Sequence, residues 1–178
     1  QTNMKLACRA VEITSHNEFD FELLIEPTCG KGNFILAGLL KGKSLKKVIG
    51  IEIYQPYVWE TKFKIFDLYI NNPGLVKPEI EIMHQNVFDF DVKQIEPDYK
   101  SFKTLILGNP PWVTNAGLGS IESKNLPAKS NFKKLKGLDA VTGKGNFDIA
   151  EYITLLMLDN FSNHNGRLCF LIKNSVIK

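Results

Sequence analysis

The residues with the most distinctive chemistry are the tetrapeptide Asn109-Pro110-Pro111-Trp112, which follows an apolar run at 105–107. Proline has no N–H donor and a fixed φ, so two prolines end a strand in a rigid turn. The turn presents two acceptors in one geometry, the carboxamide oxygen of Asn109 and the carbonyl oxygen of Pro110. Trp112 adds a flat face on which a base can stack, for about 1–3 kcal/mol. The combination suits a planar group that carries an NH2.

The exocyclic amine of adenine is a group of this kind. Its lone pair is delocalised, and accepting both N–H bonds localises the lone pair on nitrogen. The same two oxygens stabilise the positive charge that develops when the amine attacks. Each 1.36 kcal/mol gained in this way is about tenfold in rate. The ammonium product loses its proton readily, so no strong base is required, which suits a chain with 3 histidines, none beside the motif.

A second candidate site is the stretch from Glu26 to Phe34, which reads EPTCGKGNF and lies between an apolar strand and a helix. Gly30 and Gly32 let the backbone turn tightly and approach a ligand. Glu52 follows Gly32 by 20 positions, the spacing at which a carboxylate can accept both ribose hydroxyls of a nucleoside. There is neither a third glycine nor a Gly-Lys-Ser/Thr, so the loop favours a nucleoside without a pyrophosphate. The alternative is an ordinary tight turn with a solvated glutamate.

Asn86 follows the third predicted strand and is a candidate for contact with an adenine ring. Val87 or Phe88 would then pack on the face of the ring. The alternative is that Phe88 and Phe90 are core residues, which is the interpretation we favour for the phenylalanines.

Hydrophobic periodicity predicts a chain in which strands and helices alternate. Helices are expected over 4–13, 34–40, 54–70 and 147–161, and strands over 21–25, 48–53, 79–83, 104–107 and 167–172. This alternation predicts an α/β fold with a mostly parallel sheet and helices on both faces, in a single domain over 1–178. Segment 115–146 has little apolar periodicity and is rich in lysine, so it is either a phosphate-contacting loop or a solvated one.

Composition sets mild limits on function. The net charge of +3 is too small to imply a nucleic-acid partner by itself. The sequence has no apolar run long enough to span a bilayer and no signal peptide, and its 3 scattered cysteines favour a reducing cytoplasm over a disulfide frame or a metal site.

Taken together, these stretches resemble the S-adenosylmethionine-dependent N6-adenine DNA methyltransferases of bacterial restriction–modification systems, which carry an Asn/Asp-Pro-Pro-Tyr/Phe/Trp signature. The resemblance implies a Rossmann-like methyltransferase fold, S-adenosylmethionine as cofactor, double-stranded DNA as substrate, a cytoplasmic location and a restriction endonuclease or specificity subunit as a possible partner. The catalytic residues it implies are Asn109, Pro110, Pro111 and Trp112. The cofactor-binding residues it implies are Thr2, Glu26, Pro27, Gly30, Gly32, Phe34, Glu52, Ile53, Asn86, Val87 and Asn109.

The sequence departs from the family pattern in three places. Asn86 replaces a usual aspartate, although an amide oxygen can still accept a hydrogen bond from the adenine amine. Thr2 stands where the family has a Thr-Pro segment. Two further strands and a target-recognition domain would follow residue 178, so a catalytic-domain fragment with an incomplete sheet is expected. Methylation of a protein glutamine or an RNA base, and a non-catalytic cofactor- or DNA-binding module, remain as alternatives.

Overall fold

A five-stranded parallel sheet forms the centre of the molecule. The computed structural model describes residues 2–16, 19–91, 101–112, 149–162 and 165–172. The strands lie in the order β3-β2-β1-β4-β5, and every neighbouring pair is parallel. Their bounds are β1 Leu23–Glu26, β2 Lys47–Glu52, β3 Glu79–His84, β4 Thr104–Gly108 and β5 Gly166–Phe170.

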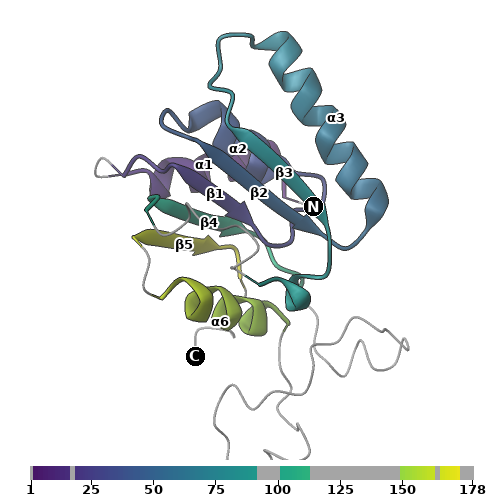
Figure 1. Ribbon diagram of the computed structural model, residues 1–178, viewed down its shortest axis with the longest axis vertical. Helices are drawn as coiled ribbons and strands as arrows, with labels where there is room; N and C mark the ends of the chain where they lie inside the picture. The colour runs from purple at the N-terminus through teal and green to yellow at the C-terminus, as the bar shows by residue number, and fades with distance from the viewer. Residues whose placement is uncertain (1, 17–18, 92–100, 113–148, 163–164, 173–178) are drawn as a thin grey trace, which may run out of the picture.

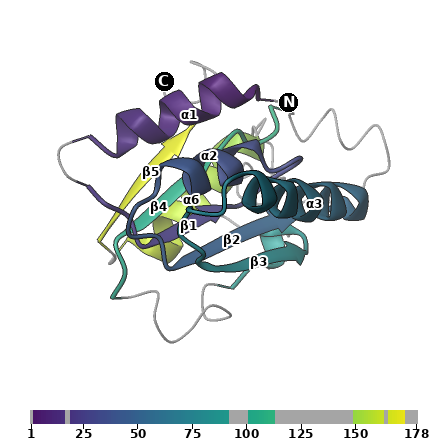
Figure 2. The same cartoon turned by 90° about the horizontal axis from the view of Figure 1, so that it is seen from above.

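Helices cover both faces of this sheet, as Figures 1 and 2 show. On one face lie α1 (Met4–Thr14), α2 (Asn33–Lys41) and α3 (Gln55–Asn71), and on the other lies α6 (Ile149–Phe161). Successive residues of a strand point to opposite faces. Leu24 and Leu105 accordingly join the core under α1, α2 and α3, while Ile25 and Ile106 join the core under α6. The predicted α/β class is therefore confirmed.

The predicted bounds agree with the structure to within two residues at most ends, and the short 3-10 helix η1 (Val87–Asp89) was not predicted. Residues 147–148 of the last predicted helix and the lysine-rich segment 115–146 lie outside the described residues.

The order of the strands brings the two candidate motifs together. The chain moves outward from β1 through β2 to β3, then returns to place β4 on the other side of β1. The segments that leave β1 and β4 therefore diverge, and ligands of open α/β sheets bind in the crevice at such a switch point. Glu26 is the last residue of β1, and Asn109 directly follows β4.

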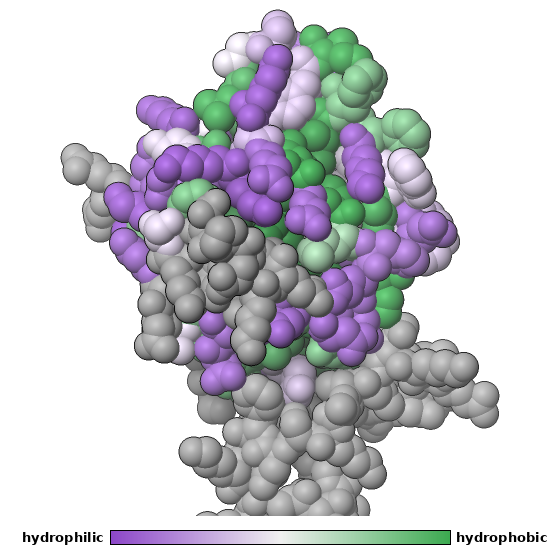
Figure 3. All heavy atoms as spheres, in the orientation of Figure 1, coloured by the Kyte–Doolittle hydropathy of each residue, from purple (hydrophilic) through white to green (hydrophobic). Residues whose placement is uncertain are grey.

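Helix α3 has two apolar faces. Val58, Thr61 and Ile65 are buried against the sheet. On the outer side Trp59, Phe63, Phe66 and Ile70 are exposed, and hydrophobic atoms are visible over α3 in Figure 3. Within the described ranges, no helix is both long and apolar enough to cross a membrane.

Candidate active site

Two cavities meet in the crevice at the carboxyl ends of β1 and β4. The first, which we call the polar cavity, has a volume of about 330 Å³ and lies beside the loop that joins β1 to α2. The second, the apolar cavity, has a volume of about 380 Å³ and lies beside the ends of β2 and β3. Their linings share Thr28, Asn109 and Pro111. The two cavities thus form one site with a common wall.

Nearly all of the predicted site residues line this site. Those in the polar cavity are Thr2, Glu26, Gly30, Phe34, Asn109, Pro110, Pro111 and Trp112. Those in the apolar cavity are Pro27, Glu52, Ile53, Asn86, Val87, Asn109 and Pro111. Gly32 is the exception, because it lines neither cavity.

Gly32 serves the fold of the loop. It has a φ of +73°, in the left-handed region, and a Cβ built on it would lie 2.5 Å from Cγ2 of Thr61 on α3. Thr61 also donates from Oγ1 to the carbonyl oxygen of Gly30, at 3.1 Å. Gly32 therefore allows α3 to approach the loop, and α3 then holds Gly30 at the edge of the polar cavity.

Lys31 is a lining residue that the sequence did not single out. Its Nζ lies 3.2 Å from Oε2 of Glu60, and its carbonyl oxygen accepts from Nζ of Lys64 at 3.1 Å. Glu60 and Lys64 also pair with each other, four positions apart on α3. The spacing of Glu60 and Lys64 indicates an exposed face of α3, but no sequence pattern connects that face with Lys31. Lys31 brings a positive charge to the rim of the polar cavity.

Glu26 brings a buried carboxyl group to the same cavity. It is 2% exposed, and its Oε2 accepts from the backbone N–H of Ile35 at 3.2 Å. Burial raises the pKa of Glu26 well above its usual value, and the charge of Glu52 adds to the rise, while the bond from Ile35 opposes it. A cationic group that enters the cavity would favour the ionised form. The geometry therefore suits an ammonium ligand.

Glu52 lies at the end of β2, on the apolar cavity. Its Oε2 accepts from the N–H of Gly30 and its Oε1 from the N–H of Tyr54, each at 2.7 Å. The two bonds fix the carboxylate. Each carboxylate oxygen has a second lone-pair position, so both can still accept a hydroxyl from a ligand.

Asn86 lies beyond the end of β3, and its side chain has a local partner. Its Oδ1 accepts from the N–H of Phe88 at 3.1 Å and so caps η1. The carboxamide NH2 is the group left to face a ligand, together with the second lone pair of the oxygen. Phe88 lines the cavity and also packs edge-on against Tyr152, whereas Phe90 is buried in the core under α6.

The wall shared by the cavities carries polar atoms without partners. Within the described part of the chain, Oδ1 of Asn109 and Oγ1 of Thr28 are buried and make no hydrogen bond. Leaving such an atom unsatisfied costs about 1–3 kcal/mol, so each one requires an explanation. Because both residues line both cavities, a bound ligand is the direct explanation.

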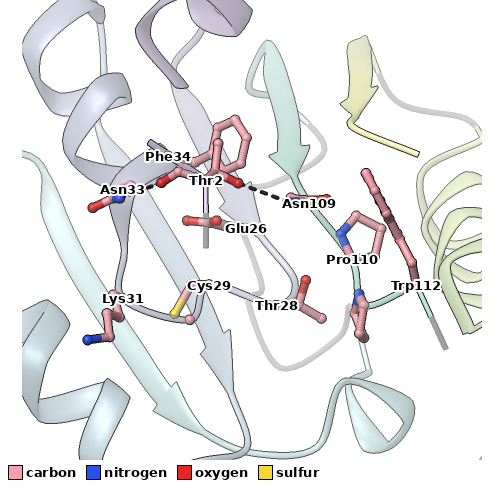
Figure 4. Close-up of a pocket in the computed structure, with 12 residues that line it drawn as sticks. Thr2, Glu26, Thr28, Cys29, Lys31, Asn33, Phe34, Asn109, Pro110 and Trp112 are labelled. Atoms are coloured by element: carbon pink, nitrogen blue, oxygen red, sulfur yellow. Dashed lines mark hydrogen bonds between the residues drawn. The ribbon is translucent and has the colours of Figure 1, made fainter. Parts of the chain in front are cut away.

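The rest of the tetrapeptide frames this wall, as Figure 4 shows. Pro110 is buried, and Trp112 stands beside it with 45% of its surface exposed. The indole Nε1 of Trp112 donates to the carbonyl oxygen of Leu171 at 3.1 Å, which holds the ring at the mouth of the polar cavity. The family resemblance also implies that residues 145–148 border the pocket for the target base, but they lie outside the described residues.

Comparison with known proteins supports the resemblance. No protein-family model matches the sequence. The chain is 38% identical over 176 residues to the type II methyltransferase M.NspV of Nostoc sp., across 99% of this chain and 35% of that protein. It is 28% identical over 118 residues to the type II methyltransferase M.BanIII of Aneurinibacillus aneurinilyticus, across 61% of this chain and 20% of that protein. The chain thus spans about a third or less of the length of these relatives.

The fold has a counterpart among solved structures. A Pyrococcus horikoshii protein provisionally assigned as an RNA methyltransferase superposes with a TM-score of 0.51 and 15% identity, over 99% of this chain and 65% of that one. At this identity the match bears on the fold alone. The sequence is thus similar to parts of two type II methyltransferases, and the fold is similar to that of one solved structure.

Proposed function

We propose that the protein transfers a methyl group from S-adenosylmethionine to the exocyclic N6 amine of an adenine flipped out of duplex DNA. The observation that carries this proposal is Oδ1 of Asn109, a buried acceptor without a partner in the wall between two cavities. An acceptor in that place suits an N–H donor that arrives with the substrate. The amine of a base is such a donor, and enzymes that act on a base take it out of the stack.

The two cavities fit the two ends of S-adenosylmethionine. In the polar cavity, the carboxyl of Glu26 suits the ammonium of an amino acid, and Lys31 suits its carboxylate. In the apolar cavity, Glu52 suits the ribose hydroxyls, and Val87 suits one face of a purine. When bound, the cofactor supplies an electrophilic methyl group on a cationic sulfur.

The residues of the chain then hold and activate the amine. Oδ1 of Asn109 and the carbonyl oxygen of Pro110 accept its two N–H bonds and stabilise the positive charge that forms on nitrogen. The indole of Trp112, already held by Leu171, offers its face to the base. The methylated ammonium gives its proton to water, so this step does not require a side chain that acts as a general base.

The test is to incubate the protein with methyl-labelled S-adenosylmethionine and, in parallel, duplex DNA, RNA and a protein mixture. Labelled DNA is then digested to nucleosides, and the modified nucleoside is identified by mass. We expect N6-methyl-2′-deoxyadenosine from the DNA, and no label in RNA or protein. Label only in RNA or protein would reject the DNA proposal, and N4-methyl-2′-deoxycytidine would reject the choice of adenine.

The biological setting belongs to the same proposal. M.NspV and M.BanIII are type II methyltransferases, which supports a role in restriction–modification, with a restriction endonuclease or specificity subunit as partner and the cytoplasm as location.

Contacts between the lysines of segment 115–146 and DNA phosphates remain a prediction. Lysine-to-alanine changes there should weaken DNA binding and reduce its salt dependence, and an unchanged salt slope would exclude the contacts.

A further inference from the structure

The N-terminal segment reaches the amide of Asn109 across the crevice. Nδ2 of Asn109 donates to Oγ1 of Thr2 at 3.1 Å, between residues 107 positions apart. Figure 4 shows this bond at the polar cavity. We propose that Thr2 is a positioning residue for Asn109, whose hydroxyl holds the carboxamide so that Oδ1 faces the wall shared by the cavities. The inference rests on the proposed function, in which Oδ1 receives the substrate amine.

Thr2 is itself held from two sides. Its carbonyl oxygen accepts from Nδ2 of Asn33, the first residue of α2, at 2.6 Å. The next residue, Asn3, caps α1 by accepting from the N–H of Leu6 at 2.8 Å. Helices α1 and α2 pack together in one core. The position of the Thr2 hydroxyl is therefore set by two packed helices rather than by a loose chain end.

A carboxamide needs such a partner because its oxygen and its NH2 group have nearly the same size, so that shape alone does not fix which of them faces the site. If the amide turned over, its NH2 would meet the NH2 of the substrate, and two donors would face each other. An unpartnered buried oxygen also costs about 1–3 kcal/mol, which favours turning toward any donor nearby. The bond to Thr2 occupies Nδ2 and leaves Oδ1 as the group that faces the site.

Thr2 lines the polar cavity, so a ligand bound there can reach its hydroxyl and, through it, the amide of Asn109. A hydroxyl has one donor position and two acceptor positions. If its O–H donates to an anionic group in the cavity, only its lone pairs remain for Asn109. The carboxylate of the proposed cofactor is such an anion, so its binding would lock the amide with Oδ1 toward the substrate.

The first test reads the amide directly and needs no activity. The side-chain amide signal of Asn109 in a 15N-labelled protein is assigned by its loss in Asn109→Asp. We expect slow hydrogen exchange of this amide in the wild type and in Thr2→Ser, and exchange at least about tenfold faster in Thr2→Val. Fast exchange in the wild type would show that the NH2 faces the cavity, and would overturn the inference.

The second test is a double-mutant cycle on methyl transfer. At saturating S-adenosylmethionine, Thr2→Val should lower kcat by about 10- to 100-fold, and Thr2→Ser should restore most of the rate. The family signature allows Asp at this position. In Asn109→Asp both side-chain oxygens are acceptors, so either orientation of the carboxylate presents an acceptor to the substrate. In the Asn109→Asp background, Thr2→Val should lower kcat by less than about threefold. Equal losses in both backgrounds would assign Thr2 to cofactor binding or folding instead.

The two tests separate the failure of this inference from the failure of the proposed function. If the wild type methylates neither DNA, RNA nor protein, the proposed function fails, and the exchange experiment still decides whether Thr2 holds the amide. If methylation occurs but Thr2→Val leaves the exchange unchanged, the positioning role alone is rejected.

Discussion

The polar and the apolar cavity differ in how they select a ligand, although they share a wall. The polar cavity brings together two ionisable side chains, the buried carboxyl of Glu26 and the ammonium of Lys31. The apolar cavity is built mostly from side chains such as Ile51 and Ile149, with Glu52 as its charged group. One region suits a zwitterion, and the other suits a flat ring with hydroxyls. A ligand with two unlike ends can therefore be held in one orientation, with its central part at the shared wall.

The largest effect should come from the wall that both cavities share. Asn109→Ala removes the acceptor and should lower the rate of methyl transfer by about 10²- to 10³-fold. Because the proposed contacts of the two ends of the cofactor do not include this oxygen, cofactor affinity should stay within about threefold. Single-turnover kinetics and calorimetric titration measure the two quantities. An equal loss in both would mean that Asn109 mainly serves cofactor binding.

A second change separates the apolar cavity from the polar one. Glu52→Ala removes the proposed ribose acceptor and leaves the N–H groups of Gly30 and Tyr54 without their bonds. Affinity for adenosine and for S-adenosylhomocysteine should fall by about 100-fold or more, because two hydrogen bonds to a charged group are lost and each is worth about 1.5–3 kcal/mol. Titration with both ligands checks this. Unchanged adenosine binding would remove Glu52 from the nucleoside site.

The matching change in the polar cavity is Glu26→Gln. This substitution should lower the affinity for S-adenosylhomocysteine by about tenfold and leave the affinity for adenosine unchanged, since adenosine has no ammonium group. In the wild type, affinity should rise with pH as Glu26 loses its proton, because only the carboxylate attracts the ammonium. Titration in buffers of different ionisation enthalpy should show proton release on binding, which Glu26→Gln abolishes. Proton release that persists in the variant would assign it to another group.

The raised pKa of Glu26 also bears on stability, with a defined sign. A folded form that binds the proton more tightly than the unfolded form loses stability as pH rises from the ordinary glutamate pKa toward the raised one. Glu26→Gln should therefore stabilise the ligand-free protein at the upper end of this range and not at its lower end. Thermal unfolding across pH gives the comparison, and a stabilisation that does not vary with pH would show that burial of the charge is not its cause.

The smallest effect is expected at Asn86, and it would sharpen the assignment of the apolar cavity. Asn86→Asp keeps an oxygen for the N–H of Phe88 and replaces the NH2 with a second acceptor. If the adenine amine approaches this side chain, affinity for adenosine should rise by a few-fold. Calorimetry measures this affinity. Asn86→Ala is the control, because it removes both the side-chain amide and the cap of η1. A fall in affinity with Asp would indicate that the NH2 donates to a ring nitrogen.

Local patterns were enough to predict the fold and most of the lining. Apolar runs such as 48–53 and 104–107 found the strands, and the family motifs identified Glu26, Glu52 and Asn109. The sequence did not predict contacts between distant segments. Thr2 and Asn109 are 107 positions apart, and no periodicity connects them. The fit of Gly32 against Thr61 also depends on how α3 crosses the loop, so Gly32 was assigned to ligand contact although it lines neither cavity.

The position of the crevice between β1 and β4 has a consequence for folding. The strands β1, β2 and β3 with their helices are consecutive, so the loop that joins β1 to α2 and Glu52 belong to a local half of the chain. The register that pairs Ile25 with Ile106 joins residues far apart in sequence, and closing so long a loop is slow compared with local contacts. Asn109 should therefore reach the site among the last steps of folding. The chain would acquire the parts proposed to hold a nucleoside before the part proposed to act on the amine.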